Sequence, residues 1–258
     1  MPRPDPDFMV RLARDAEELE AAQHLRYRVF VQELGSDGEM VDHDAQLEKD
    51  RFDPEFDHLL LLDRSRGDTA RDQVVGVYRL LTDEGASRIG QFYSEDEYDL
   101  TVLRQSGRKL LELGRSCLHA DYRGGTGMFH MWSALGDYVQ QRGIEILFGT
   151  ASFHGTDIAP LAAPLSLLHH RHLAPPDLRV RTREDAYQSM DLIPEAELNR
   201  PAAMRAVPAL IKGYLRLGGF VGDGAFVDHA FNTTDVCLVL DTAQMSEAQA
   251  RLYGRGAA

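Results

Sequence analysis

The sequence predicts a mixed α/β fold, and three patterns in its 258 residues carry this prediction. Apolar runs typical of strands occur at 8–13, 58–63 and 73–81, and a polar turn joins the last two as a hairpin. Apolar residues at helical spacing lie between strand-like runs. A strand, a glycine turn, a helix and a strand at 110–151 form a βαβ unit, which favours neighbouring parallel strands.

The residue pattern in the first quarter of the chain predicts one helix followed by an acidic loop. Asp15 is a suitable N-cap for a helix that buries Leu25 and ends near Gly35. Residues 35–57 are loop-like and rich in carboxylates. Such runs are usually solvated, but the nearby arginines leave two interpretations open, a site for a cationic substrate and an internal ion-pair network.

The strand of the βαβ unit is where we expect the active site. Residues 110–118 are mostly apolar, but Glu112 and Arg115 interrupt the pattern, and a charge in a buried strand needs a reason. Regular alternation puts these two side chains on opposite faces, which disfavours a direct ion pair between them unless Gly114 forms a bulge.

A glycine-rich turn follows this strand and predicts an anion site. A helix that begins near Thr126 would direct unpaired N–H groups and its positive dipole end outward, where a phosphorylated cofactor or carrier arm could bind. The helix is expected to end at Gly143, before a strand at 144–151. The residues assigned to this site are Arg123, Gly124, Gly125, Thr126 and Gly127.

The second half of the chain predicts an insertion, one helix and two strands. Prolines divide 153–205 into short helical pieces, which we interpret as an insertion or lid. A helix is expected at 209–217, strands at 220–227 and 235–240, and a helical tail at about 243–258. We expect one domain spanning 1–258, with helices flanking a mixed central sheet.

Composition excludes several classes of function. The net charge of −13 argues against binding to nucleic acid. Two cysteines are too few for a disulfide framework, and with no apolar targeting segment they favour the cytoplasm. The histidines at 169–172 have no carboxylate at supportive sequence spacing, so we expect no metal site.

The order of these elements resembles the GNAT acyltransferase fold. The segment from Tyr214 to Phe220 (YLRLGGF) is similar to the Tyr-x-x-x-Gly-Phe segment of many GNAT domains, and the glycine turn resembles their pantetheine-pyrophosphate loop. Four further blocks resemble the acyl-homoserine lactone synthases, which take acyl chains from acyl carrier protein. These blocks are RYRVF at 26–30, EKDRFD at 48–53, GVYRL at 76–80 and ELGR at 112–115.

A third resemblance extends over nearly the whole chain, to the ornithine lipid N-acyltransferase family. It rests on ELGRSC at 112–117, PALIKGYLRLG at 208–218 and FVDHAFNTTDV at 226–236. The resemblance implies transfer of a 3-hydroxyacyl group from acyl carrier protein to the α-amine of ornithine, giving lyso-ornithine lipid without a further cofactor. Relatives use glutamine or another amino acid, and these motifs do not separate the acceptors.

This chemistry needs a base for the ammonium of the acceptor and an acid for the leaving thiolate. Glu112 is the candidate base, because burial can raise the pKa of a carboxyl group toward neutral pH. The alternative is that Glu112 forms a structural ion pair with Arg115. Tyr214 is the candidate acid, against the alternative that it packs in the core. An alternative to direct attack by the amine is an acyl-enzyme formed on Cys117. This is disfavoured, because a cysteine in an apolar strand is usually inert.

Charged residues elsewhere are assigned to recognition. Asp50 and Asp53 could bind the cationic groups of ornithine, and a basic face is needed for acidic acyl carrier protein. Lys212 and Arg216 are candidates for that face, with Arg123 and the arginines at 179, 181 and 183, and the same helix could contact anionic membrane lipid. The residues assigned to the carboxylate or the acyl chain are Arg26, Arg28, Phe30, Arg79 and Arg115.

Two rival functions remain. A noncatalytic module that binds acyl carrier protein would keep the basic face without needing Glu112. An acetyl-coenzyme A dependent N-acetyltransferase would need the regular glycine loop, from which the turn at 123–127 departs.

Overall fold

The computed structural model describes residues 5–244, whose contacts group into two compact units. The described part of the first unit comprises 5–89 and 113–143, and that of the second comprises 90–112 and 144–244. Strand β5 (Leu110–Leu118) contributes residues to both units. The expected single domain at 1–258 stays a prediction, and its helical tail lies outside the described residues from 245 onward.

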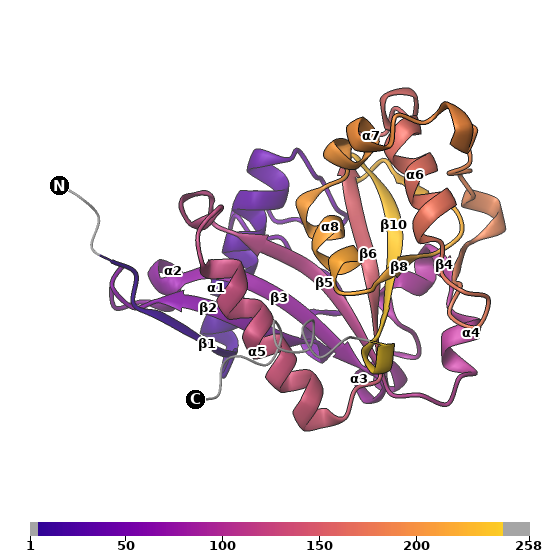
Figure 1. Ribbon diagram of the computed structural model, residues 1–258. Helices are drawn as coiled ribbons and strands as arrows, with labels where there is room; N and C mark the ends of the chain where they lie inside the picture. The colour runs from indigo at the N-terminus through magenta and orange to yellow at the C-terminus, as the bar shows by residue number, and fades with distance from the viewer. Residues whose placement is uncertain (1–4, 245–258) are drawn as a thin grey trace. The chain divides into compact units, whose positions relative to one another are not determined.

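The first unit is an antiparallel sheet covered by a helix on each face (Figure 1). Its order is β1 (Phe8–Leu12), β2 (Asp57–Asp63), β3 (Val74–Thr82) and β5. Helix α1 (Ala16–Arg26) packs on Leu60 and Leu62, whereas α5 (Gly127–Arg142) contributes Met131 beside Leu61. Because side chains alternate along β2, the two helices lie on opposite faces.

The helix from Asp15 continues beyond α1 in a π-helical form. Asp15 is its N-cap as predicted, since its side chain accepts a hydrogen bond from the backbone N–H of Glu18. Residues Tyr27–Glu33 are π-helical, and Gly35 follows with a φ of 76°. Further short elements are η2 (Asp53–Glu55), α2 (Ala70–Gln73), α3 (Asp83–Ile89) and η4 (Ala120–Tyr122).

The second unit is built around β6 (Ile146–His154) and β10 (Thr233–Asp241), which pair antiparallel along their whole length. Residues 110–112 of β5 pair with 146–148 of β6 in parallel, so the predicted βαβ unit is confirmed. On the other side, β10 pairs with β8 (Phe220–Val221) and β9 (Phe226–Asp228). The mixed α/β fold with flanking helices is therefore as expected.

The elements around these strands are shorter than the sequence pattern indicated. The strand expected at 220–227 is divided, because the chain turns at Gly224, where φ is 86°. The predicted insertion at 153–205 contains α6 (Ala162–His172) and α7 (Arg200–Ala206), with β7 (Arg181–Thr182) paired to β4 (Tyr98–Asp99). The remaining elements are η3 (Tyr93–Asp96), α4 (Thr101–Arg104), η5 (Ala159–Leu161), η6 (Glu184–Ala186), η7 (Glu195–Glu197), α8 (Ala209–Arg216) and η8 (Thr242–Gln244).

Within residues 5–244, none of the helices combines the length and the apolar character needed to cross a bilayer.

Candidate active site

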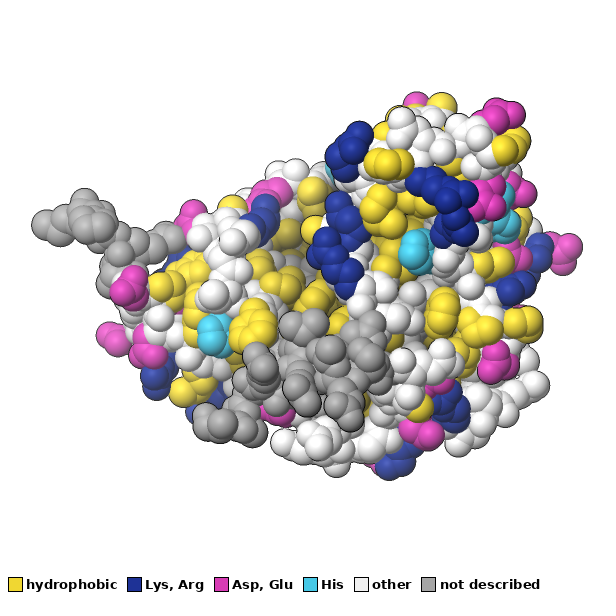
Figure 2. All heavy atoms as spheres, viewed as in Figure 1, with side chains coloured by type: hydrophobic (Ala, Val, Ile, Leu, Met, Phe, Trp, Pro, Cys, Tyr) yellow, Lys and Arg dark blue, Asp and Glu magenta, His cyan; other side chains and the backbone are white. Residues whose placement is uncertain are grey.

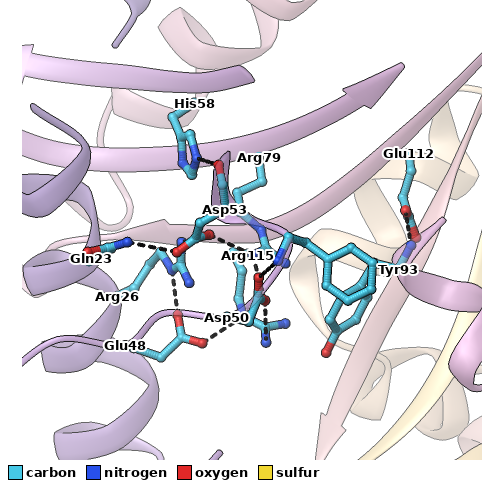
Figure 3. Close-up of polar contacts among 11 residues, drawn as sticks. Gln23, Arg26, Glu48, Asp50, Asp53, His58, Arg79, Tyr93, Glu112 and Arg115 are labelled. Atoms are coloured by element: carbon cyan, nitrogen blue, oxygen red, sulfur yellow. Dashed lines mark hydrogen bonds and ion pairs between the residues drawn. The ribbon is translucent and has the colours of Figure 1, made fainter. Parts of the chain in front are cut away.

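Three arginines and three carboxylates of the first unit form a closed ring of alternating charge (Figure 3). Each arginine contacts two carboxylates and each carboxylate contacts two arginines. The ring therefore has no net charge. In order around it, the members of this arginine–carboxylate ring are Arg26, Glu48, Arg115, Asp50, Arg79 and Asp53.

Asp53 is the most heavily bonded carboxylate of the ring. One of its oxygens accepts from Arg26 at 2.6 Å and from Arg79 at 2.8 Å, and the other accepts from Gln23 at 2.9 Å. Both arginine side chains are fully buried. Burial opposes the charge on Asp53, but the attraction of the two arginines outweighs it and lowers the pKa of this carboxyl group.

Glu48 joins two arginines from different parts of the chain. It pairs with Nε of Arg26, and its other oxygen lies 3.1 Å from Nε of Arg115. Burial again opposes the charge, and the two arginines overcome it, so the pKa of Glu48 falls to about 2. The same contacts raise the pKa of Arg26 against its burial.

Arg115 reaches the ring because β5 does not alternate regularly there. Its φ of 48° is left-handed, a conformation that costs a non-glycine residue about 1–2 kcal/mol. The side chain pairs with Glu48 and lies 3.6 Å from Asp50. The interruption of regular alternation therefore lies at Arg115, one residue after Gly114.

Glu112 lies on the first part of β5, in the second unit, and is 1 % exposed. Its carboxylate accepts hydrogen bonds from the backbone N–H groups of Tyr93 and Ser94, both at 2.7 Å, and from the Ser94 hydroxyl (Figure 3). Three donors stabilise the charged form of a buried carboxylate. Glu112 is thus a buried carboxyl group with three hydrogen-bond donors, and it also holds the start of η3.

Other predicted residues are not members of the ring. Arg28 is exposed and its guanidinium lies 2.6 Å from His119, whereas Phe30 packs against the core beneath α1. In the second unit, Tyr214 is buried on α8, the helix that also carries Lys212 and the exposed Arg216. Tyr214 as acid stays a prediction.

The glycine turn leads into α5 as the sequence predicts. Gly124 has a φ of 76°, and Thr126 is the N-cap without a hydrogen bond from its side chain. Arg123 lies beside it, paired with Glu33 at 2.7 Å. The start of this 16-residue helix therefore offers backbone N–H groups for an anion.

The two cysteines are poor nucleophiles. Both are buried, and burial raises the pKa of the Cys117 thiol to about 12 and also raises that of Cys237. This disfavours an acyl-enzyme at Cys117.

At the histidine cluster the fold adds a carboxylate that sequence spacing did not indicate. Asp191 lies near His169 and His170, with potential ligand atoms within 4.8 Å. However, Nε2 of His170 is also 3.0 Å from the carbonyl of Ile193, a contact consistent with a structural hydrogen bond.

Sequence reasoning missed several residues of the site. Glu48 belongs to the acidic run for which an ion-pair network was one interpretation, but it was not assigned to the site. Gln23, Tyr93 and Ser94 carry no sequence signal, because their importance arises from tertiary contacts.

The fold is that of the GNAT acyltransferases. The family described as Acetyltransferase (GNAT) domain matches residues 25–133. Among solved structures, the N-acyl amino acid synthase FeeM from uncultured soil microbes has a TM-score of 0.52 at 13 % identity, covering 93 % of each chain. The CoA-dependent acyl-homoserine lactone synthase BjaI has a TM-score of 0.51 at 16 % identity, covering 95 % of this chain and 87 % of that one.

Curated relatives identify the family more narrowly. An L-ornithine N(alpha)-acyltransferase of Rhodobacter capsulatus is 58 % identical over 96 % of this chain and 95 % of its own length. A protein of the same name from Brucella abortus is 42 % identical over 95 % of this chain and 88 % of its own. The chain belongs to the L-ornithine N(alpha)-acyltransferase family and is an enzyme.

Proposed function

We propose that this enzyme transfers a 3-hydroxyacyl group from acyl carrier protein to the α-amine of L-ornithine, giving lyso-ornithine lipid. The names of its relatives support ornithine as the acceptor. The observation that carries the chemistry is Glu112, a buried carboxyl group of the central strand that accepts hydrogen bonds from the start of η3. The acyl donor and its 3-hydroxyl group come from the family resemblance.

In this mechanism Glu112 takes a proton from the ammonium of the acceptor, directly or through a water molecule. The neutral amine attacks the thioester carbon, and backbone N–H groups near the end of β5 stabilise the oxyanion, each worth about 3 kcal/mol. The intermediate then expels the thiolate, which takes a proton from Tyr214, while the attacking nitrogen loses its second proton to the Tyr214 phenolate. The proton taken up by Glu112 passes to solvent. One C–N bond forms, one C–S bond breaks, and no cofactor is consumed.

The phosphopantetheine arm of the donor would bind at the start of α5. The turn at Gly124 and the first N–H groups of the helix suit its phosphate, and Arg123 adds a positive charge. An acceptor other than ornithine, such as glutamine, would leave these steps unchanged.

The test is an incubation of purified enzyme with 3-hydroxyacyl carrier protein and an equimolar amino-acid mixture, with N-acyl products identified by mass spectrometry. We expect N-acylornithine to predominate. Another amino acid in the product would keep the mechanism and change the acceptor. Product formed only with acetyl-coenzyme A, or none, would contradict the proposal.

We place the docking face for acyl carrier protein on α8 and its neighbours. Figure 2 shows Lys and Arg side chains among apolar ones over α6, α7 and α8, and α8 carries Lys212 and the exposed Arg216. Acyl carrier protein is acidic, so a positive face would favour its encounter. An anionic lipid surface near the departing product would be attracted by the same face.

Reversing one of these charges should weaken docking. Lys212→Glu or Arg216→Glu should raise the KM for acyl carrier protein about 5-fold, equal to ~1 kcal/mol, with a smaller effect at high salt. The KM for the amino acid should not change. Arg71→Glu, an exposed arginine of the first unit, is the control. Equal KM values for these variants and the control would remove α8 from the docking face.

A further inference from the structure

Three carboxylates of the second unit form an acidic cluster to which the proposed mechanism gives no role. Glu97 follows η3, Asp228 ends β9 and Asp235 lies in β10. One oxygen from each lies within 4.8 Å of the others. Glu97 and Asp235 are only 6 % and 5 % exposed, while Asp228 is partly exposed. Two carboxylates of the acidic cluster, Glu97 and Asp235, are therefore buried, and the third, Asp228, is more accessible.

A buried hydroxyl group lies beside this cluster. Thr233 is directly opposite Asp228 in the β9–β10 pairing and two residues before Asp235, so the three side chains share one face of the sheet. Thr233 is 9 % exposed, and among residues 5–244 its Oγ1 has no hydrogen-bond partner. A buried hydroxyl without a partner favours a ligand at this position.

The geometry suits an alkylammonium group. Such a group has three N–H donors and no acceptor, which matches acceptors grouped within 4.8 Å, and its charge offsets the repulsion among carboxylates. The arginine–carboxylate ring is a weaker candidate for this ligand, because three arginines already balance its three carboxylates.

We propose that Glu97, Asp228, Asp235 and Thr233 bind the side-chain ammonium of the amino-acid acceptor. The inference rests on the proposed function and adds the residues that select a diamino acid.

The position of Glu112 is consistent with this assignment. Burial raises the pKa of the Cys237 thiol, and the charges of Glu112 and Glu97 both raise it further. Glu112 and Glu97, one member of the acidic cluster, therefore both act on the same buried side chain of β10.

Asp228→Asn tests the inference with little structural change. Oδ1 of Asp228 accepts from the backbone N–H of Phe231 at 2.9 Å, and an asparagine oxygen can keep this bond. The variant should lower kcat/KM for ornithine about 10-fold, since one charge of a partly buried pair is lost. L-2-aminopentanoate, which is ornithine without the side-chain amine, should react equally with variant and wild type.

Two further variants complete the experiment. Thr233→Val replaces the hydroxyl group by a methyl group of similar size and should also lower kcat/KM for ornithine alone. Asp177→Asn, an exposed aspartate of the same unit, is the matched control and should leave both substrates unchanged.

The outcomes separate the inference from the proposed function. If the wild type acylates ornithine but Asp228→Asn and Thr233→Val keep the wild-type ratio of the two substrates, the inference is overturned alone. Thermal stabilisation of the wild type by Mg²⁺ or Ca²⁺ that is lost in Asp228→Asn would also overturn it, in favour of a metal site. If the wild type acylates no amino acid, both proposals are overturned.

Discussion

Replacing Glu112 by glutamine is expected to lower kcat for amide formation about 10²- to 10⁴-fold, the usual contribution of a positioned general base. Glutamine is close to glutamate in shape and cannot take the proton from the acceptor's ammonium. The KM values for both substrates should change much less, because the loss falls on a proton transfer in the transition state. The measurement is steady-state kinetics with acyl carrier protein as the donor.

The main alternative is that Glu112 only anchors η3. Its carboxylate accepts two backbone N–H groups and a hydroxyl group there, so any substitution also disturbs the turn. Glu95→Gln is the matched control, because Glu95 accepts from the backbone N–H of Phe92 in the same turn at 2.6 Å. An anchoring role predicts similar losses in both variants, accompanied by similar losses of thermal stability.

The pH dependence separates the two roles further. If Glu112 is the base, any acidic limb of the wild-type pH–rate profile that belongs to the base should be absent from the residual activity of Glu112→Gln. An unchanged acidic limb in the variant would assign the base to another group.

The strands were predictable because local pattern decides them. The runs at 58–63 and 73–81 are apolar enough to be buried on both faces, and the βαβ connection determines that 110–112 pairs in parallel with 146–148. The division between β8 and β9 was missed. It depends on the backbone at Gly224, and apolar residues on both sides concealed the turn.

The arginine–carboxylate ring could be predicted only in part from the sequence. The nearness of Arg26 to the acidic run indicated either a substrate site or an ion-pair network, and the contacts show the network. Arg115 could not be assigned to it, because regular alternation along β5 is interrupted only by the left-handed backbone of this residue. Ion-pair partners that are more than 20 residues apart in the sequence are brought together by tertiary packing, which sequence spacing does not indicate.

The acidic cluster could not be found from sequence for the same reason. Glu97 is more than 100 residues from Asp228 and Asp235, and only the pairing of β9 with β10 aligns the last two with Thr233. Individually, each resembles a common surface carboxylate.

Arg26→Met is expected to reduce the free energy of unfolding by about 3–5 kcal/mol, because it leaves buried carboxylates without the charge that compensates them. Arg26 is fully buried between Glu48 and Asp53. The free energy of unfolding of Arg26→Lys should lie between those of Arg26→Met and the wild type. A lysine ammonium keeps the charge but cannot reproduce the guanidinium group that bonds two carboxylates. Urea unfolding at neutral pH measures the change.

Arg28→Met is the matched control, two residues away and exposed, and should change stability by no more than about 0.5 kcal/mol. Equal losses in Arg26→Met and Arg28→Met would mean that the ring contributes no more than a surface contact.

Lowering the pH should remove the part of the free energy of unfolding that comes from the ion pairs of Arg26. A carboxyl group whose pKa is lower in the folded protein stabilises the fold above its ordinary value, and this stability disappears as pH falls toward the folded value. For Glu48 the interval runs from 4.5 down to about 2, and Asp53 is lowered in the same direction. The wild type should therefore lose stability steeply across this interval. Arg26→Met, which lacks the main attraction on both groups, should lose much less there, so the difference between the two proteins should shrink as the solution is acidified. A difference that stays constant from neutral pH to pH 2 would show that Arg26 acts through packing and not through charge.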